Sequence, residues 1–271
     1  MSDVDSDFTG SIPDIYDSHL VPILFEGYAD DLARRVVRHT PTAVLEIAAG
    51  SGAVTRVLAP RLGRNTRYVV TDINGAMLER ARRRQPDYDE IEWQEANALS
   101  LPFEDNSFDV VLCQFGVMFF PDHVAGFSEA RRVLRPGGRF LFNSWGAIEK
   151  NDFSNITTQT VISLYTEDPP LFLARTPFGY TEKPRIEADL ATAGFADINI
   201  EEVEKTSHAE KADDFAFGQL FGSPLSLEVN ARGEPSIDEV REAIEAALVK
   251  QFGSGPINGG LAAMVTEAVA P

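Results

Sequence analysis

Apolar and polar residues follow two alternating periodicities over the first half of the chain. Short apolar runs typical of buried strands are separated by longer segments in which apolar residues recur every three to four positions, as on one helix face. The strand-like runs are 44–47, 68–72, 91–95, 108–113 and 139–145, and the helix-like segments are 28–39, 54–62, 77–84 and 124–134. This order predicts a mainly parallel, doubly wound α/β sheet with helices on both faces.

Beyond residue 146 the pattern becomes less regular. A proline-punctuated segment that holds Phe172, Phe178 and Tyr180 separates the first two of several helix candidates. The predicted elements are helices over 152–166, 182–193, 211–222 and 236–251, a strand over 197–205 and a final apolar segment over 261–269. We expect the final segment to return as a strand inserted at the sheet edge, which gives seven strands in all.

A single domain over residues 1–271 is expected, because no Pro/Gly/Ser-rich linker divides the chain. Within it we assign residues 1–40 to an N-terminal helical segment, 40–145 to the core and 150–225 to a partly inserted helical cap. The predicted architecture is therefore a Rossmann-like, mainly parallel, seven-stranded sheet with a helical cap insertion. The turn at 135–138 is expected to end one helix before the fifth strand begins.

Candidate ligand-binding residues follow the first two strands. Gly50-Ser51-Gly52 lies between the first strand and a helix, where glycine lets the backbone approach a ligand closely. Asp72 ends the second strand, 20 residues after Gly52, where a carboxylate can accept both hydroxyls of a ribose. Asp72 could instead cap the helix that contains Met77. Together the glycine turn and the carboxylate favour a nucleoside site.

Three motifs in register resemble those of class I S-adenosylmethionine-dependent methyltransferases. The first has an acidic residue followed by small residues at two-residue spacing, carried here by Glu46, Ala48, Gly50 and Gly52. Ala48 replaces the commoner glycine. The second comprises 97–103 and 106–109, with Asn97 where the family usually has an acidic residue, and the third is the turn 134–139. The resemblance covers residues 40–145, and Gln114 to Phe120 resembles the quinone-biosynthesis C-methyltransferase group.

The resemblance implies binding of S-adenosylmethionine and transfer of its methyl group to a small-molecule acceptor, with S-adenosylhomocysteine as product. Gln114 would lie under the methionine half of the cofactor, and the N-terminal segment would fold across it. The implied cofactor-binding residues are Glu46, Ala48, Gly50, Ser51, Gly52, Asp72, Ile73, Met77, Asn97, Ala98, Leu99 and Gln114.

Candidates for catalysis are few, because in-line methyl transfer depends mainly on alignment and exclusion of water. His123, after the fourth strand, could act as a general base, or could simply begin a helix. Tyr16 could lie near the transferred methyl group. Two alternative functions are a non-catalytic adaptor that binds the same cofactor and an NAD(P)-dependent oxidoreductase. Thr55 argues against the oxidoreductase, because it stands where the dinucleotide fingerprint has its third glycine.

Composition narrows the choice of partners. The net charge of -18 disfavours nucleic acid, and the basic run at 82–84 is interpreted as a solvated helix end. The single cysteine, Cys113, lies in an apolar strand, so neither a disulfide framework nor a metal cluster is expected. The acidic start, Met1 to Asp5, is unlike a secretory signal, and the apolar run 110–120 is too short for a membrane span. These features predict a cytoplasmic protein without a membrane anchor.

Overall fold

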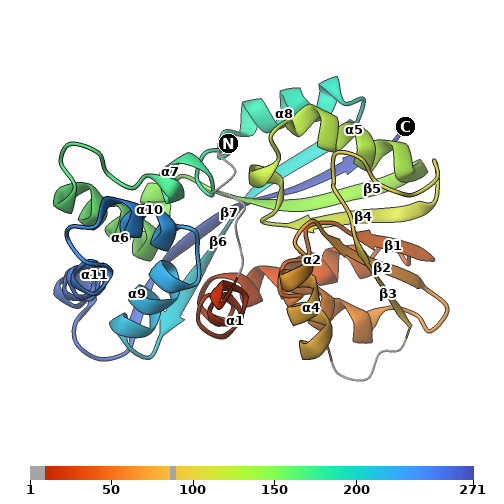
Figure 1. The fold of residues 1–271 in the computed structure, drawn as a ribbon. Helices are drawn as coiled ribbons and strands as arrows, with labels where there is room; N and C mark the ends of the chain where they lie inside the picture. The colour runs from red at the N-terminus through yellow and green to blue at the C-terminus, as the bar shows by residue number, and fades with distance from the viewer. Residues whose placement is uncertain (1–9, 86–89) are drawn as a thin grey trace.

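A central seven-stranded sheet organises the chain (Figure 1). The computed structural model describes residues 10–85 and 90–271, so the segment Met1 to Asp5 lies outside the described residues. The strand order is β3-β2-β1-β4-β5-β7-β6; β1 to β5 run parallel, and β7 runs antiparallel to β5 and β6. The strands are β1 (Ala43–Glu46), β2 (Arg67–Asp72), β3 (Ile91–Glu95), β4 (Phe108–Gln114), β5 (Leu134–Trp145), β6 (Ala196–Ala209) and β7 (Ile257–Val269). The predicted fold class is confirmed, including the insertion of the final strand next to the edge.

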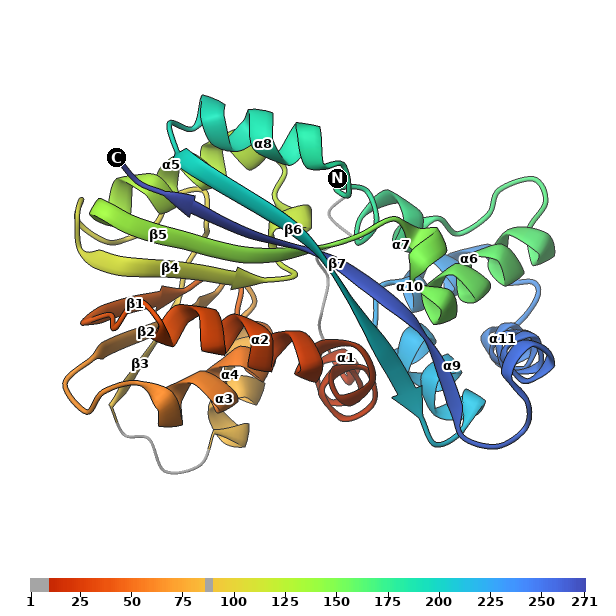
Figure 2. The same cartoon turned by 180° about the vertical axis from the view of Figure 1, so that it is seen from behind.

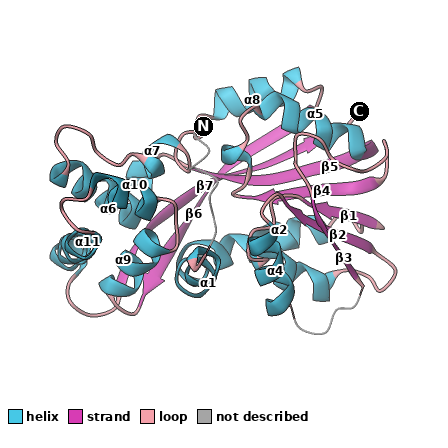
Figure 3. Cartoon of the chain, viewed as in Figure 1, coloured by secondary structure: helices cyan, strands magenta, loops and turns pink. Residues whose placement is uncertain are grey.

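Helices cover both faces of this sheet (Figure 3). On one face, apolar side chains of α2 (Glu26–Val37), α3 (Ala53–Leu58) and α4 (Gly75–Arg84) form a core with residues of β1, β2 and β4. On the other face, α5 (His123–Val133) packs on β5, and α8 (Lys183–Thr192) packs on β6 and on α5. Strand side chains alternate between the two cores, as expected for a sheet buried on both sides.

A second group of helices forms the cap beside the sheet. It consists of α6 (Asp152–Leu164), α7 (Phe172–Arg175), α9 (Ala212–Phe221), α10 (Leu225–Arg232) and α11 (Ile237–Phe252). Seen from behind, the long strands β6 and β7 extend out of the sheet toward these helices (Figure 2). The predicted cap boundaries of 150–225 therefore need correction: α8 and β6 belong to the sheet layer, and α11 joins the cap.

The N-terminal helical segment lies between the sheet and the cap (Figure 2). It begins with α1 (Ile12–Ile15), continues as the π-helix η2 (Tyr16–Phe25) and ends with α2. Pro22 lies within η2 and has no backbone N–H group, so the regular α-helical hydrogen bond is not available there. Ten-residue π-helices are rare and often mark functional positions.

Several predicted boundaries differ from the structure. The expected turn at 135–138 is part of β5, which pairs with β4 at Leu134 and again from Arg139, and Gly137 has a positive φ of 80° between them. The predicted helical segment 54–62 is α3 followed by the short helix η3 (Ala59–Arg61). Short helices that the periodicity did not predict are η4 (Val117–Phe119), η5 (Ile148–Lys150), α7 and α10. Among residues 10–85 and 90–271, no helix has the length and apolar character to cross a bilayer.

Candidate functional site

A cavity of about 400 Å³ opens at the carboxyl ends of β1, β2 and β4. This position, where the strand order reverses, is the usual ligand site of open α/β sheets. Its walls come from three parts of the chain: the loops after the first four strands, the π-helix η2, and the cap helices α6, α7 and α9. Residues far apart in sequence therefore share one site.

The loop after β1 has an unusual backbone. Gly50 and Gly52 have φ values of 57° and 79°, and Ala48 also lies in the left-handed region, with a φ of 51°. That conformation is strained for alanine. Its methyl group fits because residue 116 is glycine: a Cβ on Gly116 would lie 2.6 Å from the Ala48 Cβ. Ala48 and Gly50 line the cavity, as does Ser51.

Asp72 holds this loop and the start of the next helix together. Its Oδ2 accepts a hydrogen bond from the Gly50 N–H at 2.8 Å, and its Oδ1 accepts one from the Asn74 N–H at 2.8 Å. The helix cap is Asn74, whose side chain accepts from the N–H groups of Ala76 and Met77, so the alternative that Asp72 caps α4 is wrong. Burial raises the pKa of the Asp72 carboxyl, although these backbone hydrogen bonds oppose the rise. A carboxylate has further lone pairs, and Asp72 lines the cavity.

Glu46 and Gly52 do not line the cavity, and their contact with a cofactor stays a prediction. The Glu46 side chain is buried and accepts hydrogen bonds from Thr55 Oγ1, at 2.9 Å, and from the Tyr68 hydroxyl. Gly52 packs against α4, where an added Cβ would lie 2.9 Å from the Ala81 Cβ. Both residues therefore position the loop and helix that other residues of the site require.

Burial raises the pKa of Glu46 to about 7, from an ordinary value of 4.5. Between these two values the folded protein keeps a proton that the unfolded chain loses, so rising pH lowers the free energy of unfolding by up to about 1.4 kcal/mol per unit. We expect Glu46→Gln to remove this dependence. Urea unfolding between about pH 5 and about pH 8 should show the wild-type losing about 2–3 kcal/mol relative to the variant. Parallel pH curves for the two proteins would contradict this account.

The loops after β2 and β3 form an apolar slot. Ile73 lines the cavity and is 64% exposed, which is unusual for a large apolar side chain. Met77, Ala98 and Leu99 line the cavity with it. Asn97 is also part of the lining; its Oδ1 accepts from the Leu99 N–H at 2.9 Å, and its Nδ2 and the second Oδ1 lone pair can bond a ligand.

Gln114, at the end of β4, brings an amide to the cavity wall. Its Nε2 donates to the backbone oxygen of Phe25 at 3.3 Å, whereas its Oε1 is buried and has no hydrogen-bond partner within the described residues. A buried acceptor without a partner is costly unless a ligand satisfies it. Beside it, Phe115 stacks on Trp145 with ring centroids 3.9 Å apart. Phe115 has a φ of 52°, a second strained residue at this site.

The two catalytic candidates have different positions. Tyr16 lines the cavity, and burial together with the Asp72 and Asp17 charges raises the pKa of its hydroxyl, so the hydroxyl stays protonated at neutral pH. His123 is not part of the lining; it begins α5 and stacks on Tyr180 with ring centroids 3.9 Å apart. Burial also lowers the pKa of His123. The geometry therefore does not support His123 as a general base at this cavity.

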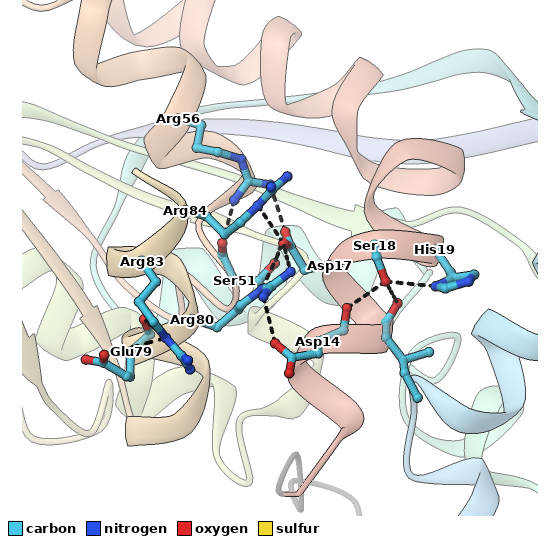
Figure 4. Close-up of polar contacts among 11 residues, drawn as sticks. Asp14, Asp17, Ser18, His19, Ser51, Arg56, Glu79, Arg80, Arg83 and Arg84 are labelled. Atoms are coloured by element: carbon cyan, nitrogen blue, oxygen red, sulfur yellow. Dashed lines mark hydrogen bonds and ion pairs between the residues drawn. The ribbon is translucent and has the colours of Figure 1, made fainter. Parts of the chain in front are cut away.

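A buried carboxylate that sequence reasoning missed joins η2 to α3 and α4 (Figure 4). The Asp17 side chain has no exposed surface and faces Arg56 Nη2 at 2.9 Å, Arg80 Nη2 at 3.0 Å and Arg84 Nε at 3.0 Å. Ser51 Oγ also donates to Asp17, at 3.1 Å. The basic run at 82–84 is therefore not wholly a solvated helix end. We call Asp17 and its three arginines the Asp17 cluster.

The seven-stranded sheet has the Rossmann-like fold of class I methyltransferases, and the comparisons agree with this fold. Residues 45–142 match the family model described as a methyltransferase domain. The ubiquinone/menaquinone biosynthesis C-methyltransferase UbiE of Brucella abortus is 42% identical over 108 residues, or 39% of this chain and 40% of that protein. UbiE of Hahella chejuensis is 43% identical over 102 residues, 36% of this chain and 41% of that protein. The match thus spans about two-fifths of these relatives.

Similar solved structures cover more of the chain. Phosphoethanolamine N-methyltransferase 2 of Haemonchus contortus, solved with phosphomonomethylethanolamine and S-adenosylhomocysteine, has a TM-score of 0.59 and 17% identity, covering 99% of this chain and 60% of that one. The YcgJ protein of Bacillus subtilis has a TM-score of 0.56 and 18% identity, covering 90% of this chain and 98% of that one. At such identities the likeness establishes a shared fold.

Proposed function

We propose that this chain binds S-adenosylmethionine and transfers its methyl group to a small-molecule acceptor held under the cap. The observation that carries the proposal is the Asp72 carboxylate beside a positive-φ glycine loop, both facing a cavity closed by aromatic side chains. The UbiE relatives and the Haemonchus structure support the choice of cofactor.

The residues present fit this cofactor. The remaining lone pairs of Asp72 would accept ribose hydroxyls, and the exposed Ile73 and Met77 would cover the adenine. The partnerless Gln114 Oε1 would accept a hydrogen bond from the methionine ammonium. Alanine at position 48 adopts a left-handed backbone conformation that glycine would adopt without strain.

The bound cofactor supplies an electrophilic methyl group on a sulfonium. The protein's contribution is alignment and exclusion of water, which can supply much of the rate enhancement of a displacement reaction. The side chains of Leu20, Leu24 and Phe25 on η2 close one side of the cavity, and Tyr16 lies among them. We propose that this segment acts as a cover over the cofactor.

Incubation with methyl-labelled S-adenosylmethionine and a mixture of small metabolites tests the proposal. We expect label to move into a dialysable product one methylene heavier than its precursor, and Asp72→Ala to slow the transfer at least about tenfold when the cofactor is below saturation. Label that enters only protein or nucleic acid would contradict a small-molecule acceptor. Binding of the cofactor with no transfer to any acceptor class would favour the adaptor alternative.

A further inference from the structure

The part of the cavity under the cap differs in chemistry from the part near Asp72 and Gln114, where we place the cofactor. Its walls are aromatic and aliphatic: Phe172, Leu173 and Phe178 come from the cap, and Trp145 ends β5. Within the described residues, Asp72 is the single carboxylate of the lining, and no lysine, arginine or histidine belongs to it. A charged acceptor would therefore be buried there without a counter-ion, which is costly.

Three polar residues of the cap side, Ser154, Gln219 and Ser223, interrupt this apolar wall. Gln219 on α9 and Ser154 on α6 line the cavity, and each residue is only 4% exposed. Within the described residues, neither the Gln219 amide nor the Ser154 hydroxyl makes a side-chain hydrogen bond to the protein, whereas the Ser223 hydroxyl already donates to the Gln219 backbone oxygen at 2.6 Å. The Gln219 and Ser154 side chains both line the cavity, so their hydrogen-bonding groups are available to a ligand bound there.

Close packing fixes the position of Gln219. The preceding residue, Gly218, lies against η2, where an added Cβ would be 2.8 Å from the His19 Cβ and 3.3 Å from Leu20 Cδ2. Helix α9 therefore cannot shift toward η2, and the Gln219 amide is held at the wall of the cavity. A fixed amide can donate and accept hydrogen bonds with little loss of freedom on binding.

We infer that the acceptor is an uncharged molecule with an apolar, ring-sized body and a hydrogen-bonding group, and that Gln219, with Ser154, selects that group. This inference rests on the proposed function, because it assumes that the other half of the cavity holds the cofactor. The apolar body contacts the aromatic wall, and the polar group satisfies the Gln219 amide. A site built around a buried amide discriminates against analogues that cannot bond to it.

Three probes with the same ring test the inference: cresol, toluene and toluate. Each is titrated calorimetrically into the protein saturated with S-adenosylhomocysteine. We expect cresol to bind about tenfold more tightly than toluene or toluate. In Gln219→Leu, the affinity for cresol should fall to that for toluene, while the affinities for toluene and for S-adenosylhomocysteine stay unchanged. Gln251→Leu, the same substitution at an exposed glutamine of α11, should leave all affinities unchanged.

This experiment distinguishes failure of the proposed function from failure of the inference about the acceptor. If S-adenosylhomocysteine itself does not bind, the proposed function fails. If it binds but toluate matches or exceeds cresol, or no probe binds, the assignment of an uncharged acceptor is overturned. If Gln219→Leu keeps the preference of cresol over toluene, Gln219 does not select the polar group.

Discussion

Replacing Asp72 with alanine is expected to weaken binding of S-adenosylhomocysteine at least about tenfold, because charge-assisted hydrogen bonds to ribose hydroxyls contribute about 1.5–3 kcal/mol. The same change removes the acceptor for the N–H groups of Gly50 and Asn74, which further loosens the loop after β1. Calorimetric titration of wild-type and variant measures the effect directly.

Asp122→Ala is the matched control for Asp72→Ala. Asp122 is also an aspartate that accepts a backbone N–H bond, from Ala125 at 2.9 Å, but it caps α5 and is not part of the cavity lining. Its loss should cost about 1 kcal/mol of stability and leave the ligand affinity unchanged. Equal affinities for wild-type and Asp72→Ala would remove Asp72 from the cofactor site.

Replacing Asp17 with asparagine is expected to open the cover formed by η2. The three arginines of the Asp17 cluster would lose their shared carboxylate, and the neutral amide would not balance their charge. Breaking a buried ion pair typically costs about 3–5 kcal/mol, and we expect about 2 kcal/mol here because the arginines are partly exposed and can rehydrate. Dissociation of S-adenosylhomocysteine, followed by stopped flow, should become about tenfold faster.

Asp14→Asn separates this effect from a general loss of charge. Asp14 pairs with Arg80 at 2.8 Å, but its side chain is 60% exposed, so the pair should contribute little. We expect wild-type dissociation rates in Asp14→Asn. If Asp17→Asn and Asp14→Asn release the ligand at the same rate, the Asp17 cluster does not hold the cover closed.

The periodicity of the first 145 residues was sufficient to predict the sheet and its covering helices, because buried parallel strands and amphipathic helices have distinct patterns. The loop residues Gly50, Asp72 and Asn97 were also placed at the cavity from sequence order, since the carboxyl ends of parallel strands share one edge. The cap was harder to delimit, because its boundaries depend on which helices contact β6 and β7 rather than on local pattern.

Two site features could not be predicted from local sequence. Asp17 lies in an N-terminal segment that gives no sign of three arginine partners from α3 and α4; only the fold brings them together. Glu46 was expected to contact the cofactor because of its motif, yet the structure turns it toward Thr55 and Tyr68. A motif identifies which residues matter, whereas side-chain direction depends on the packing around them.

The most direct test of the central claim is calorimetric titration of the protein with S-adenosylhomocysteine and, in parallel, with NAD(H) and NADP(H). The account predicts binding of S-adenosylhomocysteine alone, with a Kd on the order of micromolar, which corresponds to about 8 kcal/mol. Binding of a nicotinamide cofactor in its place, or binding of none of the three, would contradict it.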